Sequence, residues 1–205
     1  MTGSETLEAK REQMRAIKDE ILTLTESPLY AYRSENNYFP VIGEGSHNAS
    51  IMFVGEAPGK NEAKTGRPFC GAAGKILDEL LAGVNIPRAD VYITNIVKDR
   101  PPQNRDPLPE EIAAYGAFLD RQIEIIQPSI IATLGRYSMV YIMEKFGLTN
   151  RLDTIGKLHG QAFPAKASYG DITILPLYHP ASAIYNPQLL ETLRKDFANL
   201  AFHLN

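Results

Sequence analysis

The chain has 205 residues, of which 44% are hydrophobic and 22% charged, and its formal net charge is −3. This composition is typical of a globular protein with a substantial core, and it excludes a protein that coats long stretches of nucleic acid with a strongly basic surface. A local basic groove remains compatible with the total charge. No apolar stretch is long enough to span a membrane, and the charged first 25 residues do not resemble a signal peptide, so we expect a cytoplasmic protein.

The predicted elements begin with an amphipathic helix over residues 4–25, whose apolar side chains recur at helical spacing and whose N-cap is Ser4. A polar, extended stretch follows as far as Gly45. Short apolar runs then predict buried strands at 51–54, 91–94, 130–134 and 172–178. Helical patterns predict helices at 71–82, 109–127, 136–146 and 187–204.

Strands that alternate with helices predict an α/β protein. We expect a single domain with a central, mostly parallel four-stranded sheet and helices on both faces, an α/β/α sandwich. The N-terminal helix, within residues 1–26, is expected to pack on the domain formed by residues 27–205. Ligands of such sheets bind beyond the carboxyl ends of the strands, so the residues that follow the four strands are the candidates for a site.

Motifs follow three of the predicted strands. The glycines of GEAPG at residues 55–59 suit a tight loop whose N–H groups face a pocket, although an ordinary turn has the same composition. Asn95 presents an amide donor and acceptor that complement O4 and N3–H of uracil, but an asparagine that only satisfies its loop is the commoner case. A single histidine such as His179 is also more often structural. Three candidates that converge on one crevice favour a functional site.

The stretches GEAPG, TGRPF, NIVKDRPPQNRDP, IIATLG and YHPAS together resemble the uracil-DNA glycosylase superfamily, and most of all its family-four members. They occur in the family's order, and the resemblance covers about residues 24–200. It implies a DNA-repair enzyme that flips uracil out of DNA and hydrolyses its N-glycosidic bond, which leaves an abasic site. That chemistry requires no metal or organic cofactor.

The resemblance also implies roles for individual residues. Phe69 stacks on the flipped uracil, Asn95 reads its O4 and N3 edge, and His179 donates to O2. Further positions in the pocket are Ala57 beside the base, the acidic catalytic positions Glu56 and Glu62, and Asn104 near the attacking water. Ser182 and Tyr185 are expected to face the DNA. The loop after Asn95 carries three basic residues that suit contacts with phosphates, although a solvated loop has the same composition; they are Lys98, Arg100 and Arg105.

One departure from the family concerns a four-iron cluster, which its members usually hold on four cysteines. The corresponding positions here are Leu24, Ser27, Asp99 and Tyr115, and none of them supplies a thiolate. The single cysteine, Cys70, does not match a cluster position. We therefore expect a cluster-free member without any metal, whose cluster site is filled by ordinary packing.

Three alternatives remain. Members of one branch of the superfamily trap uracil-DNA covalently, but they carry a basic insertion with a histidine after NIVK, where Lys98 here runs directly into Asp99. A uracil-DNA-binding module without turnover is disfavoured by the intact Phe69, Asn95 and His179. A nucleotide hydrolase needs a phosphate-loop lysine and metal-binding carboxylates that cannot be assembled here. We expect a monomer, and neither recruitment by a replication clamp nor the preferred strand context can be read from the sequence.

Overall fold

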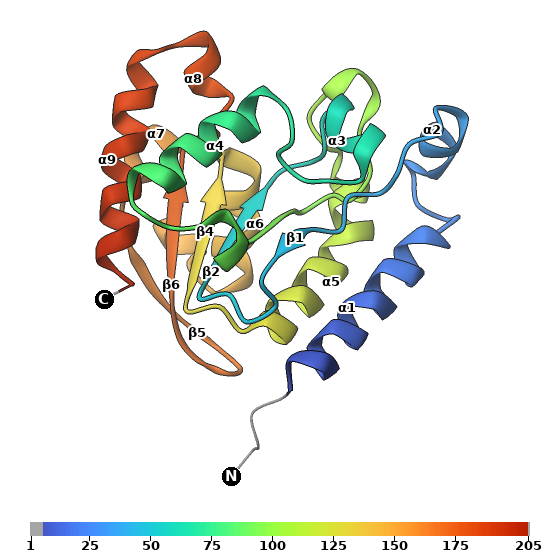
Figure 1. Cartoon of the computed structure of the whole chain (residues 1–205), viewed down its shortest axis with the longest axis horizontal. Helices are drawn as coiled ribbons and strands as arrows, with labels where there is room; N and C mark the ends of the chain where they lie inside the picture. Colours follow the sequence, from blue (N-terminus) through green and yellow to red (C-terminus); the bar gives the residue numbers. More distant parts are fainter. Residues whose placement is uncertain (1–5, 205) are drawn as a thin grey trace.

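A six-stranded sheet in the order β1-β3-β2-β4-β6-β5 forms the centre of the fold (Figure 1). The computed structural model describes residues 6–204. The strands are β1 (Glu44–Gly45), β2 (Ile51–Gly55), β3 (Tyr92–Asn95), β4 (Ile130–Leu134), β5 (Phe163–Ala167) and β6 (Gly170–Leu177). The four inner strands are parallel, whereas the edge strands β1 and β5 pair antiparallel with β3 and β6.

Helices cover both faces of this sheet. The helices of the described residues are α1 (Leu7–Leu22), α2 (Tyr30–Glu35), α3 (Lys60–Thr65), α4 (Ala72–Gly83), α5 (Pro109–Ile126), α6 (Arg136–Lys145), α7 (Ile155–Leu158), α8 (Ser182–Tyr185) and α9 (Gln188–Phe202). The 3₁₀ turns are η1 (Arg88–Asp90), η2 (Pro102–Asn104) and η3 (Thr149–Arg151). Residues of α4 and α9 pack on one face, and residues of α1, α5 and α6 pack on the other (Figure 1).

The α/β class with a mostly parallel, helix-covered sheet is confirmed, but the predicted number of four strands is wrong. All five residues of β2 are buried, because Ile51 and Phe53 face one helical layer while Met52 and Val54 face the other. Such a strand reads as a continuous apolar run. The edge strands escape prediction because β1 has only two residues and β5 alternates buried with exposed positions around Pro164.

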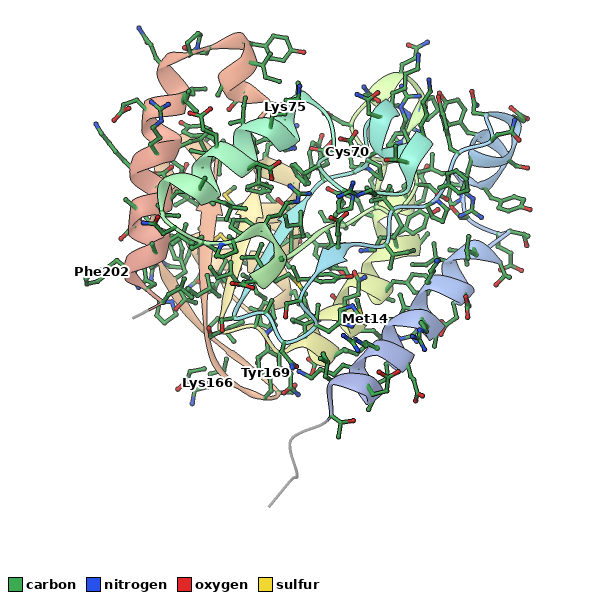
Figure 2. All side chains as sticks on the ribbon, viewed as in Figure 1. Met14, Cys70, Lys75, Lys166, Tyr169 and Phe202 are labelled. Carbon is green, nitrogen blue, oxygen red and sulfur yellow. The ribbon has the colours of Figure 1, made fainter. Side chains whose placement is uncertain are left out.

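The N-terminal helix α1 packs beside α5, and its buried residues include Met14, labelled in Figure 2. Thr6 caps the helix by accepting a hydrogen bond from Ala9 N at 3.2 Å, whereas the predicted cap Ser4 lies outside the described residues. The stretch predicted to be extended after α1 contains the short helix α2. No helix in the described part of the chain is both long and apolar enough to cross a membrane.

The carboxyl ends of the parallel strands meet at one edge of the sheet. Gly55 ends β2 and pairs in register with Asn95, which ends β3. Gly135 follows β4, and His179 comes two residues after the end of β6. The fold therefore brings together the residues that the sequence singled out after separate strands.

Candidate active site

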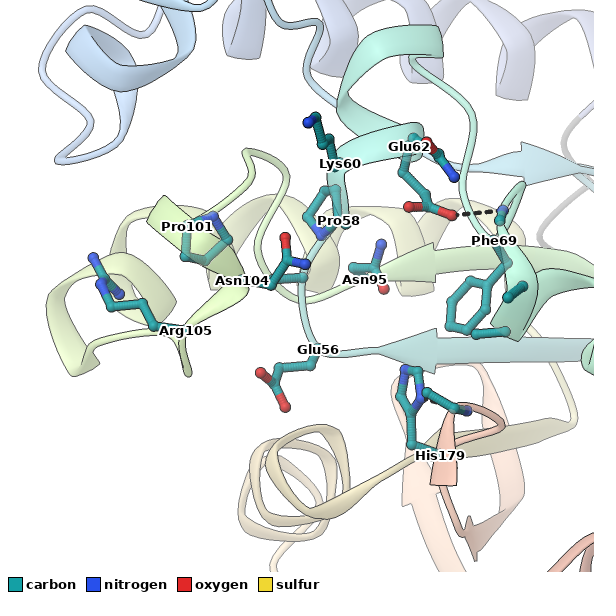
Figure 3. A pocket seen from close by; sticks show the side chains of 17 residues that line it. Glu56, Pro58, Lys60, Glu62, Phe69, Asn95, Pro101, Asn104, Arg105 and His179 are labelled. Atoms are coloured by element: carbon teal, nitrogen blue, oxygen red, sulfur yellow. Dashed lines mark hydrogen bonds between the residues drawn. The ribbon is translucent and has the colours of Figure 1, made fainter. Parts of the chain in front are cut away.

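A pocket of about 610 Å³ opens at this edge of the sheet, and Figure 3 shows its lining. Its volume is in the range of small-molecule sites. The predicted residues that it brings together are Glu56, Ala57, Glu62, Phe69, Asn95, Asn104, Arg105 and His179. The remaining lining residues are Pro58, Gly59, Lys60, Asn61, Gly71, Ala72, Ala73, Pro101 and Ala181.

The absence of a side chain at Gly55 makes the floor of the pocket possible. A Cβ at this position would lie 2.3 Å from Oδ1 of Asn95 and 2.8 Å from Cζ of Phe69. Both distances are well below van der Waals contact. Glycine therefore lets the amide and the aromatic ring approach the end of β2 together.

Asn95 is only 2% exposed, although it lies at the pocket. Among the described residues, its side-chain amide has no hydrogen-bonding partner, while its backbone carbonyl accepts from Lys98. The polar atoms of this amide are not among the buried side-chain atoms that lack a partner, so they face the open space of the pocket. The amide of Asn95 is therefore available to a ligand.

Phe69 forms an aromatic wall of the pocket. Its ring stacks on that of His179 with a centroid distance of 5.6 Å and an interplanar angle of 27°. Its backbone has φ +47°, a left-handed conformation that is uncommon for a bulky residue. Glu62 stabilises this loop, because Oε1 accepts from the N–H groups of Cys70 at 3.0 Å and Gly71 at 2.9 Å. Glu62 thus both lines the pocket and fixes the segment that carries Phe69.

His179 is held as a neutral imidazole. Burial lowers its pKa to about 4. Ala181 N donates to Nδ1 at 3.1 Å, which assigns the proton of the neutral ring to Nε2. The side chain projects into the pocket (Figure 3). His179 is therefore a hydrogen-bond donor that carries no charge at neutral pH.

A carboxyl group with a shifted pKa lies on the other side of the pocket. Burial raises the pKa of Glu56 to about 7, and the nearby charge of Asp106 adds to this shift while Arg136 opposes it. Asn104 also lines the pocket, and its Oδ1 accepts from Nε of Arg100 at 2.6 Å. A carboxyl group that titrates near neutral pH is suited to proton transfer.

The prediction that Lys98 contacts DNA is wrong. Its side chain is fully buried, and Nζ donates to Oγ1 of Thr94 at 2.8 Å, to Asn95 O at 2.7 Å and to Oε1 of Gln122 at 2.6 Å. Burial lowers the pKa of this amine well below its usual value. Since every donor of Lys98 is used inside the protein, it cannot reach a phosphate.

The other predicted DNA contacts differ in accessibility. Arg100 donates to the hydroxyls of Tyr32 and Tyr38, and Arg105 forms a bidentate ion pair with Glu111. The hydroxyl of Ser182 donates to His179 O at 2.6 Å, so it supports the backbone after β6. Tyr185 is 88% exposed. Of this group, only Arg105 lines the pocket.

Sequence reasoning assigned no role at the site to Lys60 or Asn61, which line the pocket from the first turn of α3. The available signal was their place directly after the GEAPG loop. Lys60 is exposed, so it is a lysine at this pocket that a phosphate can approach.

The positions that correspond to cluster cysteines do not fit an iron–sulfur cluster. Ser27, Tyr115 and Asp99 are joined by hydrogen bonds, and Leu24 packs against the core beside them. Cys70, the only cysteine, lies exposed on the loop before α4 (Figure 2). Hydroxyls and a carboxylate that bind one another cannot replace the thiolates of an all-cysteine site. The expectation of ordinary packing is corrected, since a polar network fills the site.

Within residues 6–204, no group of three or more His, Cys, Asp or Glu side chains is arranged to hold a metal ion.

The pocket itself suits a flat heterocycle, because an aromatic wall can stack on such a ring while an amide and an imidazole meet its polar edge.

The chain belongs to the uracil-DNA glycosylase superfamily, whose sequence profile matches residues 42–202. It is similar to the type-4 uracil-DNA glycosylase of Sulfurisphaera tokodaii, with 45% identity over 190 residues that cover 92% of this chain and 84% of the relative. The type-4 enzyme of Archaeoglobus fulgidus is 41% identical over 189 residues, 92% of each chain. That of Saccharolobus solfataricus is 44% identical over 182 residues, 88% of this chain and 82% of the relative.

Proposed function

We propose that this protein is a uracil-DNA glycosylase, which flips uracil out of DNA and hydrolyses the bond between the base and the deoxyribose. The observation that carries the proposal is the convergence of Phe69, Asn95 and His179 on one pocket in a chain of this superfamily. A base inside a duplex is out of reach of such a pocket, so the nucleotide must rotate out of the stack before reaction.

The flipped base is held by stacking and by its polar edge. The ring of Phe69 stacks on uracil, which contributes about 1–3 kcal/mol, and Ala57 lines the pocket beside it. The amide of Asn95 donates from Nδ2 to O4 and accepts at Oδ1 from N3–H. Cytosine presents the opposite pattern at these two atoms, so the same amide rejects it.

Catalysis depends on the charges that develop as the bond breaks. The electron pair of the C1′–N1 bond passes to uracil, and the sugar becomes oxocarbenium-like. Nε2–H of His179 donates to O2, where negative charge grows. A water molecule forms the new bond at C1′ while ionised Glu56 accepts its proton, and Asn104 helps to orient this water. Glu62 supports the reaction by holding the loop of Phe69.

DNA contacts surround the pocket. We assign phosphate contacts to Arg100, Arg105 and exposed Lys60, and Lys60 takes the place of the buried Lys98. The segment from Ser182 to Tyr185 faces the DNA backbone and the gap left by the flipped base, for which the 88% exposed ring of Tyr185 is well placed.

We further propose that the enzyme works in the cytoplasm as a monomer and without an iron–sulfur cluster. The single cysteine supports the last point, because a cluster of this type requires four cysteine ligands.

The test is a glycosylase assay on two oligonucleotides that differ only by uracil or cytosine at one position, followed by alkali to cleave abasic sites. We expect a strand break at the uracil position alone. A chain that binds uracil-DNA but leaves it intact, or that remains covalently attached to it, would refute the proposal in favour of a binding or trapping member of the superfamily.

A further inference from the structure

Four polar side chains, Ser27, Arg33, Asp99 and Tyr115, form a buried polar network. Oγ of Ser27 lies 2.5 Å from the hydroxyl of Tyr115, which donates to Oδ2 of Asp99 at 2.5 Å. Nη1 of Arg33 donates to the same Oδ2 at 3.0 Å. The side chains of Arg33 and Asp99 are only 7% and 1% exposed. The four side chains are therefore linked by hydrogen bonds in the interior of the protein.

The network joins segments that are far apart in the sequence. Asp99 is 66 residues from Arg33, and Ser27 is 88 residues from Tyr115. Arg33 also donates to Ile21 O and Leu22 O, the last carbonyls of α1, at 3.1 Å each. The network thus fastens the loop after β3 to α1, α2 and α5 through the single residue Asp99.

From Asp99 the connection continues to the pocket. Arg100, the next residue, donates to the hydroxyl of Tyr38 at 2.9 Å and from Nε to Oδ1 of Asn104 at 2.6 Å. Gln103 and Asn104 both have left-handed backbones, with φ +56° and +55°. Such conformations persist only where the surroundings impose them. Arg100 holds Asn104 directly, and Asp99 fixes the backbone that carries Arg100. The far end of the loop is held by the ion pair of Arg105 with Glu111.

The segment before Asp99 is fixed independently. Ile96 N donates to Gly55 O, and Val97 N donates to Glu56 O, each at 3.0 Å. Displacement of Asp99 is therefore expected to move the loop 99–105 and to leave Asn95 in place.

We infer that the buried polar network is a metal-free brace that positions Asn104 at the active site. Three of its members occupy positions where the family resemblance expects cluster cysteines, so hydrogen bonds connect these segments here. The inference rests on the proposed catalytic role of Asn104. Asp99 and Tyr115 are positioning residues, because they act on the reaction only through the loop.

The test compares Asp99→Asn in two backgrounds by single-turnover uracil excision at saturating DNA. In the parent enzyme, we expect the substitution to lower the rate constant about tenfold, since a small displacement of a catalytic group is costly. In the Asn104→Ala background, it should leave the remaining rate unchanged, because the group it positions is gone. The loss of thermal stability should be the same in both backgrounds.

A second variant guards against misfolding of Asp99→Asn. Tyr115→Phe keeps the ring and removes only the hydroxyl that bridges Ser27 and Asp99. Tyr115→Phe should lower the single-turnover rate constant by less than Asp99→Asn does, and it should lower it only where Asn104 is present. Glu20→Gln and Arg121→Met are the matched controls, because this exposed ion pair also joins α1 to α5 but does not touch the loop. Both controls should keep the parental rate.

The brace is overturned if Asp99→Asn and Tyr115→Phe keep the parental rate, or if they lower it equally with and without Asn104. A parental rate for Asn104→Ala alone would instead remove Asn104 from the proposed mechanism, and the brace with it. Uracil excision by the parent enzyme is measured in the same series, so failure of the glycosylase assignment would be seen separately.

Discussion

At the scale of single residues, His179 is the group whose contribution to catalysis should be largest. Its pKa is lowered to about 4, so it donates as a neutral imidazole throughout the physiological range. We predict that His179→Ala lowers the single-turnover rate of uracil excision about a hundredfold, the usual effect of losing one such donor. Affinity for uracil-DNA, measured by fluorescence anisotropy, should change little. A rate close to that of the parent would exclude His179 from the mechanism.

Glu56 should determine the pH dependence. Its pKa is raised to about 7, so the carboxylate needed to accept a proton from water is lost as the pH falls through this value. We predict that the single-turnover rate rises with pH and levels off above about 7. Glu56→Gln should give a slower rate without this inflection. If the inflection persists in that variant, another group is responsible for it.

Asn95 should select the base. In Asn95→Asp, the donor to O4 of uracil is lost, and an acceptor for the N4 amine of cytosine is gained. Each buried unpaired polar group costs about 1–3 kcal/mol, so excision of uracil should fall sharply and the relative rate on unpaired cytosine should rise. Matched oligonucleotides with uracil or cytosine at one position measure both rates. Undiminished preference for uracil would mean that Asn95 only supports its loop.

At the scale of elements, the end of β2 determines whether the pocket can form. A methyl group at Gly55 would meet Asn95 Oδ1 at 2.3 Å and the ring of Phe69 at 2.8 Å, and both belong to the proposed uracil site. We predict that Gly55→Ala abolishes most uracil excision although the protein still melts cooperatively. Gly83→Ala is the control, because no atom lies within 4 Å of a Cβ there. Equal activity of the two variants would contradict this account of the pocket floor.

The elements also show what the sequence can predict. Buried strands such as β2 were found because both faces are covered, which leaves an apolar run. Asn95 and His179 were found because parallel strands end at a common edge. The short helices α2 and α3 were missed, since six polar or mixed residues carry no helical period.

Contacts between distant residues limit such predictions. In the sequence, Lys98 belongs to a basic loop. In the structure, its side chain points into the protein because Nζ donates to Thr94 and to Gln122, which lies 24 residues away on α5. The pairing of Arg33 with Asp99 likewise spans 66 residues. Contacts between residues so far apart leave no local pattern in the sequence. The buried polar network could therefore be found only in the structure.

At the scale of the whole molecule, the structure describes a uracil-DNA glycosylase fold in which hydrogen bonds between side chains join three of the four cluster positions. A family member that depends on a cluster would lose its fold or its activity without iron, because metal binding and folding are coupled. We propose that the brace makes this chain independent of such a cluster, since its donors and acceptors all come from the chain itself.

The most direct test of this account is the iron content of an active preparation. The protein would be purified anaerobically with iron supplied, and iron would be quantified on the sample used for single-turnover uracil excision. We predict a colourless protein that excises uracil and holds essentially no iron. A brown protein with about four irons per chain, whose activity disappears when the iron is removed, would contradict the account.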